Sequence, residues 1–393
     1  MVRHDEGELI KEASPHTNGQ LVVGVDLRCL QDRFGSGVAT YTRLMLRAIK
    51  ESPDHGFQWQ IFTSGAKRPP DFSAILPDCH YRHLSIPNKI LNVTMAALNR
   101  PRVNYCFPGA DLIWQPNPLF LSSSNLPLFV TMHDISFVHF PQFFSPRTRL
   151  WYLKWVRRWL EHAPSNAHLL AVSRHTRDDI LNHFPKWQGR VTIAPPPLPP
   201  ELNDDDEAAH IKNIYGLERP FILGLGTIEP RKNINSLILA YQNFVKYYPD
   251  FDLVLAGHCQ RSAKSAIFGM INESSARLHL LGYIPAKHKE AIYRAAFCLV
   301  YPSYFEGFGY PPLEAMSGGT PVIASAVTSL PEVLGAGAIF IDPYRGAEEI
   351  TAALQTLASD SSVYRHYQEA GKERAAFLRR QFTLAPLFNL WRG

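Results

Sequence analysis

The feature that most constrains the fold is an alternation of strand-like and helix-like segments that runs through the chain twice. In the first half, a β-rich run at residues 21–30 is followed by a glycine-containing loop and by apolar residues at helical spacing. Further strand-like runs follow, with helical stretches such as 146–162 and 174–183 between them. The alternation restarts at residues 221–227. This pattern predicts parallel sheets covered by helices on both faces.

A proline-rich segment separates the two halves. The sequence PPPLPP at 195–200 cannot lie inside a helix or in a central strand, and an acidic stretch follows it. We therefore predict a polar N-terminal leader, two doubly wound α/β domains joined by a linker, and a C-terminal tail. Because such sheets bind ligands at the carboxyl ends of their strands, the ligand cleft is expected between the domains. The predicted boundaries are 1–19, 20–198, 199–215, 216–376 and 377–393.

Charge and composition exclude several classes of protein. The net charge of +5 is too mild for a dedicated nucleic-acid-binding protein, and it suits anionic small ligands or an acidic membrane surface. The five cysteines form no CxxC pair, which argues against a disulfide or zinc scaffold and favours a cytoplasmic protein. No run is apolar for the roughly 18 residues of a spanning helix, and the polar N-terminus lacks a secretory signal. We therefore expect membrane contact, if any, to be peripheral, on the inner face of the cell membrane.

The most informative stretch for function is residues 301–325. Glu306 lies in a loop after a strand, where Gly307 and Gly309 allow a ligand to approach the backbone. Two prolines then begin a helix, which places Glu314 in or near its first turn. The start of this helix suits a phosphate, and the two carboxylates suit sugar hydroxyls. On spacing alone, a solvated Glu306 and a Glu314 that merely complements the helix dipole remain equally good explanations.

Other candidate residues also follow strands. Arg231 and Lys232 place two cations at the start of a helix, where they oppose the helix dipole and indicate a compensating anion. The alternative is a solvated helix terminus. His133 ends the strand-like run 127–134, although a single histidine is more often structural. The run Asp204–Asp206 contains a DxD pattern, but its place in the linker favours a solvated charge run over a metal site.

The segment 143–163 is aromatic and basic. A helix here would bury a stripe of leucine and valine and would present three tryptophans in a separate row. It is either a core helix of the N-terminal domain or a helix with one face on an anionic bilayer. The stripe consists of Leu150, Leu153, Val156 and Leu160, and the row of Trp151, Trp155 and Trp159.

Several segments together resemble the retaining glycosyltransferases of family four, which have the GT-B fold. The resemblance covers about residues 20–375, and it is most similar to bacterial mannosyltransferases that build O-antigen and other polysaccharides. In chain order the segments are GSGVATYTRLM (35–45), TMHDISF (131–137), AVSRHTRDDI (171–180), GTIEPRKN (226–233), LVLAGH (253–258), LHLLGYI (278–284), YPSYFEGFGYPPLEAMSGGTPVIAS (301–325) and SLPEVLGAGAIFIDP (329–343).

The resemblance implies roles for the candidate residues. Glu306 and His133 would face the donor sugar, Glu314 would bind the nucleotide ribose, and Arg231 and Lys232 would neutralise the leaving diphosphate. The position of the arginine that is usual in the family is occupied by Thr227 in this chain. We therefore assign the role of that arginine to Arg231. No metal and no other cofactor is expected. The remaining donor-binding residues would be Gly35, Gly37, Gly226, Thr227, Tyr283, Ile284, Gly307, Phe308, Gly309 and Tyr310.

The resemblance also implies the reaction. We expect transfer of a hexose, mannose from GDP-mannose, to a hydroxyl of a growing glycan on a lipid carrier, and a C-terminal tail that packs on the N-terminal domain. The alternatives are a UDP- or dTDP-sugar donor, another sugar-nucleotide enzyme or phosphorylase on the same architecture, and a non-catalytic nucleotide-sugar-binding protein. A Rossmann dehydrogenase fits poorly, because no GxGxxG follows the first strand of either domain.

Overall fold

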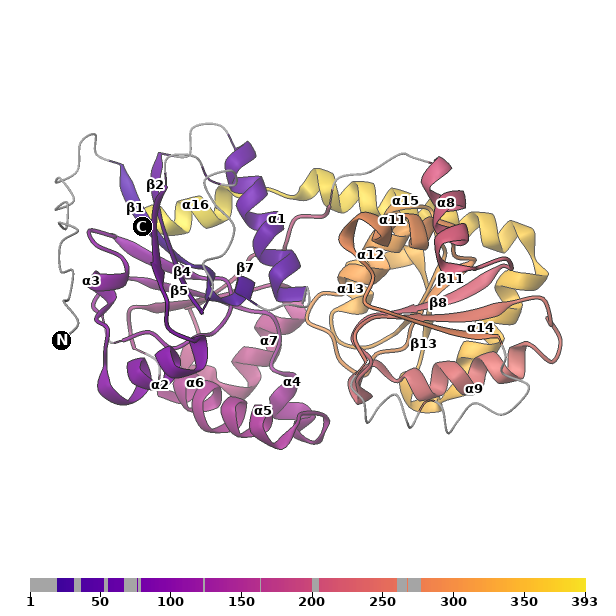
Figure 1. Ribbon diagram of the computed structural model, residues 1–393, viewed down its shortest axis with the longest axis horizontal. Helices are drawn as coiled ribbons and strands as arrows, with labels where there is room; N and C mark the ends of the chain where they lie inside the picture. Colours follow the sequence, from indigo (N-terminus) through magenta and orange to yellow (C-terminus); the bar gives the residue numbers. More distant parts are fainter. Residues whose placement is uncertain are drawn as a thin grey trace, which may run out of the picture.

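Two α/β domains lie side by side in the computed structural model (Figure 1). Each contains one parallel sheet, and the predicted α/β fold of two Rossmann-like domains is confirmed. None of the described helices has the length and apolar character of a membrane span. The structure describes residues 20–31, 37–52, 56–66, 76, 79–122, 124–162, 164–199, 205–259, 267 and 277–393.

In the part of the chain that the structure describes, the N-terminal sheet has seven strands in the order β3-β2-β1-β4-β5-β6-β7. Its strands are β1 Leu21–Asp26, β2 Phe57–Ser64, β3 His80–Leu84, β4 Leu112–Gln115, β5 Leu128–Met132, β6 Ala167–Ala171 and β7 Val191–Ile193. The α-helices are α1 Gly37–Glu51, α2 Asn88–Leu98, α3 Val103–Cys106, α4 Ser136–His139, α5 Pro146–Trp151, α6 Arg157–His162 and α7 Arg174–His183. A π-helical segment, η4 Tyr152–Val156, joins α5 to α6, and short 3-10 turns are η1 Leu27–Gln31, η3 Pro141–Phe143 and η5 Pro185–Trp187.

The described residues of the C-terminal sheet form six strands in the order β10-β9-β8-β11-β12-β13. Its strands are β8 Phe221–Leu225, β9 Asp252–Ala256, β10 Leu278–Gly282, β11 Cys298–Tyr301, β12 Val322–Ser325 and β13 Ala338–Ile341. The α-helices are α8 Asp205–Tyr215, α9 Ile234–Phe244, α11 Ala286–Ala295, α12 Tyr310–Ser317, α13 Leu330–Leu334, α14 Ala347–Ser359, α15 Ser361–Gln381 and α16 Ala385–Arg392. Its 3-10 turns are η6 Pro230–Lys232, η8 Gly335–Gly337 and η9 Pro343–Arg345.

The strand order places a crossover point in each sheet. The chain winds outward in one direction from β1 and β8, then returns to the other side at β4 and β11. At such a point the loops after neighbouring strands separate and leave room for a ligand. In the C-terminal sheet, β8 and β11 are direct neighbours, paired at Ile222 with Cys298. The loops that follow these two strands carry the candidate residues Arg231, Lys232 and Glu306.

Helix α8 occupies part of the segment for which the sequence predicts a linker, residues 199–215. It packs against α11, where the Tyr215 hydroxyl lies 3.0 Å from His288 Nδ1, and Ile211 is buried in the core of the C-terminal domain. Acidic residues at a helix start are favoured by the helix dipole, so the acidic run is compatible with a helix as well as with a loop.

Helix α16 returns the chain to the N-terminal domain (Figure 1). Trp391 is buried there, with its ring centroid 5.7 Å from that of Phe57 and 5.8 Å from that of Trp114. Phe388 packs on the same cluster. This contact completes the core of the N-terminal domain with residues from the far end of the chain.

Within the segment predicted as a helix, 143–163, residues 146–162 are helical but do not form a single regular α-helix. The π-helical turn η4 changes the register of side chains, so Leu150 is 61% exposed, against the predicted buried stripe, while Val156 and Leu160 are buried as predicted. The three tryptophans are only partly exposed and line a cavity of about 510 Å³ between this segment and α2.

Candidate active site

Three loops at the carboxyl ends of strands carry the candidate residues. The loop after β8 contains Arg231 and Lys232, the loop after β11 contains Glu306, and the loop after β5 contains His133 and Asp134. The first two belong to the C-terminal domain and the third to the N-terminal domain. Arg231 links them, because its Nη1 lies 3.5 Å from Glu306 Oε2 and 4.0 Å from Asp134 Oδ2.

The centre of the site is a buried ion pair. Lys232 Nζ lies 2.5 Å from Glu306 Oε1 and donates a second hydrogen bond of 2.6 Å to the Tyr301 hydroxyl. Only 6% of Glu306 and 9% of Lys232 is exposed. A buried charge requires a partner, and here each side chain supplies the charge that the other needs. The sequence indicated neither the contact between these residues nor the part played by Tyr301.

Arg231 is surrounded by acceptors. It donates to the Phe305 carbonyl oxygen at 2.8 Å and, through Nη2, to Glu229 Oε1 at 2.9 Å. Burial works against its charge, but the carboxylates of Glu306, Asp134 and Glu229 outweigh burial and raise the pKa of its guanidinium. Arg231 therefore stays positively charged within the site.

Glu306 is held as an anion by its neighbours. Burial alone would raise the pKa of its carboxyl, but Lys232 and Arg231 have the larger combined effect and lower it. For the ammonium of Lys232, burial lowers the pKa and contact with Glu306 opposes that effect. Because two cations act on one carboxylate, Glu306 stays ionised within the site.

The backbone around Glu306 is held by the loop after β12. The amide of Glu306 donates to Thr328 Oγ1 at 3.1 Å, and Ser329 Oγ donates to the Glu306 carbonyl oxygen at 2.9 Å. Thr328 has a φ of 56°, a left-handed conformation that is uncommon for a β-branched residue. Thr328 therefore holds the backbone of Glu306 through its hydroxyl while it adopts a conformation that its own side chain disfavours.

The two domains touch where Gly307 meets His133. A Cβ atom at Gly307 would lie only 1.7 Å from the His133 carbonyl oxygen, so no other residue fits there without movement. Thr176, at the start of α7, lies between them: its Oγ1 is 3.3 Å from the carbonyl oxygen of each. The loops that hold His133 and Glu306 are therefore in direct contact.

His133 is a half-buried imidazole whose surroundings favour the uncharged form. Burial lowers its pKa, although the hydrogen bond to the Pro116 carbonyl opposes that effect. Nε2 lies 2.8 Å from this carbonyl oxygen, which can only accept, so Nε2 carries the hydrogen and Nδ1 keeps its lone pair. The ring also packs on the edge of Tyr41, with centroids 4.9 Å apart. Asp134 Oδ1 accepts from the amide and the hydroxyl of Ser136, the first residue of α4.

Glu314 lies just beyond the first turn of α12, in keeping with the predicted position in or near that turn, and it is anchored to α11. Its Oε2 accepts a hydrogen bond of 2.8 Å from the Tyr293 hydroxyl and pairs with the Lys289 ammonium. Gly309 precedes this helix with a φ of 96°, and a Cβ there would lie 2.6 Å from Leu330. The backbone turn between Glu306 and Glu314 therefore requires glycine.

The remaining predicted donor-binding residues differ in their surroundings. Gly226 packs against Gly257, where a Cβ would lie 1.9 Å from the Gly226 carbonyl oxygen, and Thr227 beside it is exposed. Tyr283 is 50% exposed at the end of β10, whereas Ile284 is buried in the core. Gly37 begins α1, and Gly35 lies outside the described residues.

Phe308 and Tyr310 are packing residues in this structure. Tyr310 is buried among core residues of the N-terminal domain, and Phe308 packs against the cores of both domains. The Tyr310 hydroxyl has no hydrogen-bond partner among the described residues. Both side chains therefore belong to the contact between the domains.

Comparison with known families accounts for most of the chain. Residues 35–202 match the family described as Glycosyltransferase Family 4, and residues 205–374 match the family described as Glycosyl transferases group 1. The chain belongs to the glycosyltransferases of family four. The resemblance inferred from the sequence motifs is thereby confirmed.

This glycosyltransferase is similar in sequence to mannosyltransferases of Escherichia coli. It is 33% identical over 261 residues to O-antigen chain mannosyltransferase B, an alignment that spans 64% of this chain and 66% of that protein. It is 30% identical over 205 residues to the serotype-specific mannosyltransferase WbdA, which spans 50% of this chain and 25% of that protein. The chain therefore matches about two thirds of one relative and a quarter of the other.

The fold of the glycosyltransferase matches solved structures over nearly its whole length. Sucrose-phosphate synthase from Thermosynechococcus elongatus superposes with a TM-score of 0.71 and 22% identity, covering 95% of this chain and 98% of that chain. At this identity the match shows the fold alone, and it confirms the predicted GT-B architecture.

Proposed function

We propose that this glycosyltransferase moves mannose from GDP-mannose to a hydroxyl of a growing, lipid-linked glycan, with retention of configuration at the anomeric carbon. The observation that carries the proposal is the contact between the loops of Glu306 and His133 beside Arg231 and Lys232. The mannosyltransferase names of two similar proteins support the choice of sugar. The O-antigen chain in the name of one of them supports the choice of acceptor.

The cations would serve the leaving group. When the bond between the anomeric carbon and the diphosphate oxygen breaks, negative charge develops on the diphosphate. Arg231 and Lys232 are already fixed by contacts with Glu306, so they can stabilise that charge without reorganising. In this proposal the two side chains supply the positive charge, and no metal ion or other cofactor takes part in the transfer.

Glu306 and His133 would position the donor sugar. The Glu306 carboxylate can accept hydrogen bonds from sugar hydroxyls, and the lone pair on His133 Nδ1 can accept another. The acceptor hydroxyl would give its proton to the departing phosphate oxygen and form the new bond on the face that the diphosphate leaves. No side chain is proposed as a covalent nucleophile.

The nucleotide would lie along the C-terminal domain. Glu314 is held by Tyr293 and Lys289 through Oε2, and we assign it to the ribose hydroxyls. The diphosphate would lie against the loops that contain Gly226, Gly307 and Gly309. The base would lie near Tyr283, whose exposed side chain and backbone follow β10.

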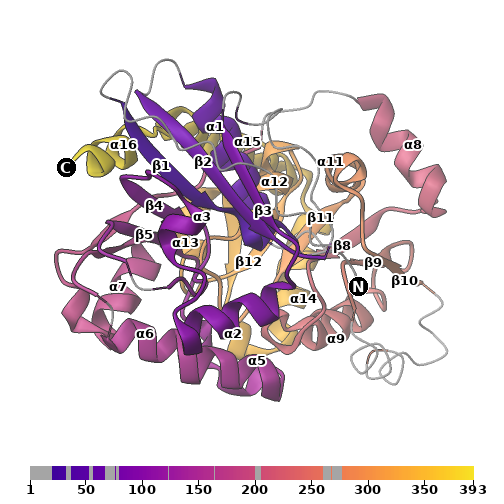
Figure 2. The ribbon, with the colours of Figure 1, turned by 60° about the vertical axis from the view of Figure 1, so that its left-hand side comes forward.

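A lipid-linked acceptor fits one face of the N-terminal domain. Helices α2, α5 and α6 lie next to one another at one end of that domain in both views (Figures 1 and 2). Helix α2 exposes Ile90, Val93 and Leu98 by 56–67%, and α5 exposes Leu150 by 61%. Exposed cations are interspersed, namely Lys89, Arg147, Arg149, Lys154, Arg157 and Arg158. Apolar residues beside cations suit the surface of an anionic bilayer.

The donor can be tested directly by ligand-dependent stability. The melting temperature would be measured with GDP, UDP, dTDP and ADP and with their common sugar conjugates. A ligand at 100 times its Kd adds about 2.7 kcal/mol, which gives a clear shift. A shift with GDP and GDP-mannose is expected. A shift with UDP or dTDP instead would favour the alternative donors, and no shift with any nucleotide would contradict the proposal.

The rival interpretation is a non-catalytic nucleotide-sugar-binding protein. Such a protein needs cations for the diphosphate, but it does not need a buried carboxylate held as an anion beside the sugar. Binding without turnover of GDP-mannose, in the presence of acceptor glycans, would favour the rival.

A further inference from the structure

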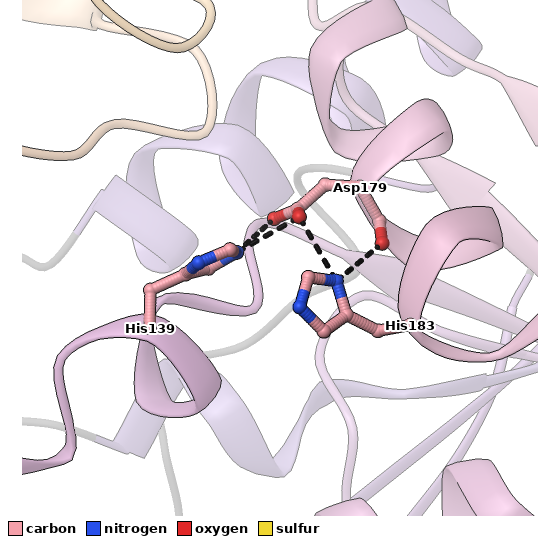
Figure 3. Close-up of side chains that lie close together, drawn as sticks. All are labelled: His139, Asp179 and His183. Carbon is pink, nitrogen blue, oxygen red and sulfur yellow. Dashed lines mark hydrogen bonds and ion pairs between the residues drawn. The ribbon is translucent and has the colours of Figure 1, made fainter.

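Three side chains with metal-binding donors converge beside the contact between the domains. His139 ends α4, which follows the loop of His133, while Asp179 and His183 lie one turn apart on α7. Figure 3 shows the Asp179 carboxylate directed between the two imidazole rings. The ligand atoms of all three residues lie within 4.8 Å of one another. No motif spacing links His139 to α7, so the cluster exists only in the folded chain.

The distances are close to those of a coordination shell. His139 Nε2 lies 2.8 Å from Asp179 Oδ1 and 2.9 Å from Oδ2, and His183 Nδ1 lies 3.2 Å from Oδ1. Zinc binds nitrogen and oxygen at about 2.0–2.1 Å, so neighbouring ligands in a tetrahedral site are roughly 3.3 Å apart. The two histidine–aspartate pairs are therefore already near that separation. Rotation of the imidazoles would bring His139 Nε2 and His183 Nδ1 to the same separation from each other.

The cluster combines a buried carboxylate with two imidazoles that are accessible to solvent. Asp179 is buried, whereas 30% of the His139 side chain and 36% of the His183 side chain is exposed, which leaves a path for an ion and for a water ligand. The His139 ring packs against Phe305, with centroids 5.1 Å apart. Two imidazoles from different helices approach the same carboxylate oxygen, and His183 Nδ1 also lies 3.0 Å from the Asp179 backbone carbonyl oxygen.

We propose that His139, Asp179 and His183 form a site for a divalent transition metal, with Zn²⁺ as the best fit to two imidazoles and one carboxylate. Zinc would replace the hydrogen between His139 and the Asp179 carboxylate, and His183 Nδ1 would exchange its hydrogen bond to the Asp179 backbone carbonyl oxygen for the ion. Water would complete the tetrahedron. The ion would join α4 to α7. The His139 ring packs against Phe305, which precedes Glu306. The bound ion would therefore also steady the loop that carries the proposed catalytic carboxylate. The site is separate from the transfer chemistry and does not depend on the proposed function.

Zinc binding can be measured on the full chain without any sugar substrate. The untagged, metal-free protein would be titrated with ZnCl₂ by calorimetry, and Co²⁺ would be added separately to record the visible bands of a tetrahedral site. We expect one tight site per chain and a higher melting temperature with zinc. His139→Ala and His183→Ala should each weaken that site by at least about tenfold, because each removes a direct ligand.

A second histidine–aspartate pair provides the matched control. His279 Nε2 lies 2.9 Å from Asp252 Oδ2 on neighbouring strands, and this pair belongs to no cluster of three potential ligands among the described residues. His279→Ala should leave the zinc affinity unchanged. Circular dichroism would establish that the variants fold. Wild-type affinity in both His139→Ala and His183→Ala would overturn the site, as would the absence of a tight site in the wild-type chain.

Discussion

Gly307 lies so close to His133 that a single added carbon atom would come within 1.7 Å of the histidine carbonyl oxygen. This is the point where the loop of the proposed catalytic carboxylate, from the C-terminal domain, meets the loop of the proposed sugar-binding histidine, from the N-terminal domain. Backbone packing therefore positions the two halves of the site relative to each other, and side-chain contacts reinforce this arrangement.

Gly307→Ala should impair transfer far more than it impairs folding. The new methyl group must push the two loops apart, and a displacement of about 1 Å can cost about 100-fold in rate. The kcat for mannosyl transfer and the melting temperature would be measured together. Gly189→Ala is the control: Gly189 has a φ of 77° but open space around its Cβ position, so it tests backbone strain without a clash. Equal kcat in the wild type and Gly307→Ala would show that this contact does not position the site.

His133 should remain neutral at pH values where an exposed imidazole takes up a proton. Its pKa is lowered by burial from an ordinary value of 6.5. As the pH falls below 6.5, the unfolded chain binds a proton at this residue while the folded chain does not, so the folded state loses stability. The free energy of unfolding of the wild type minus that of His133→Gln should therefore decrease between about pH 7 and pH 5. A constant difference would mean that the imidazole titrates normally.

The N-terminal domain contains a buried ion pair whose loss should be costly. Arg28 Nη2 lies 2.6 Å from Asp26 Oδ2 with both side chains fully buried, and it also donates to the Phe120 carbonyl oxygen. Arg28→Met leaves a buried carboxylate without its cation and should cost about 3–5 kcal/mol in chemical denaturation. Arg47→Met removes an exposed pair with Glu51 and should cost only about 0.3–0.5 kcal/mol. Similar costs for both variants would show that burial does not make the first pair more important for stability than the second.

Membrane association should depend on the exposed face of α2. Flotation with vesicles that contain anionic lipid would compare the wild type with the double variant Ile90→Asp/Val93→Asp. Two charges on the apolar surface should reduce binding strongly, and higher salt should weaken wild-type binding because the cations contribute. Tyr247→Asp, at an exposed tyrosine of the C-terminal domain, should bind like the wild type. Wild-type flotation by the double variant would exclude this face as the contact.

Local patterns were enough to predict the architecture and most of the candidate residues. Strand-like runs predict which residues lie at the carboxyl ends of strands, so the positions of Lys232, Glu306 and His133 followed from the sequence, whereas their expected roles came from the family resemblance. The acidic run at the start of α8 was ambiguous, because acidic residues are favourable both in solvated loops and at helix starts.

Contacts between distant residues could not be predicted in this way. Tyr301 lies within a strand pattern, and only the fold brings its hydroxyl to Lys232. The exposure of Leu150 depends on a π-helical turn, for which the sequence has no periodic signal. Thr328 adopts a left-handed conformation that its side chain disfavours, so propensity argues against the observed geometry.

The central claim is tested most directly by transfer of labelled mannose from GDP-mannose to lipid-linked glycan acceptors in the presence of purified protein. Wild-type protein should produce labelled glycan, and Glu306→Gln, which keeps the size of the side chain but removes its charge, should be slower by about 100–1,000-fold. Glu161→Gln, at an exposed residue paired with Arg157, should match the wild type. Absence of labelled product with the wild type, or a near-normal rate with Glu306→Gln, would contradict the account.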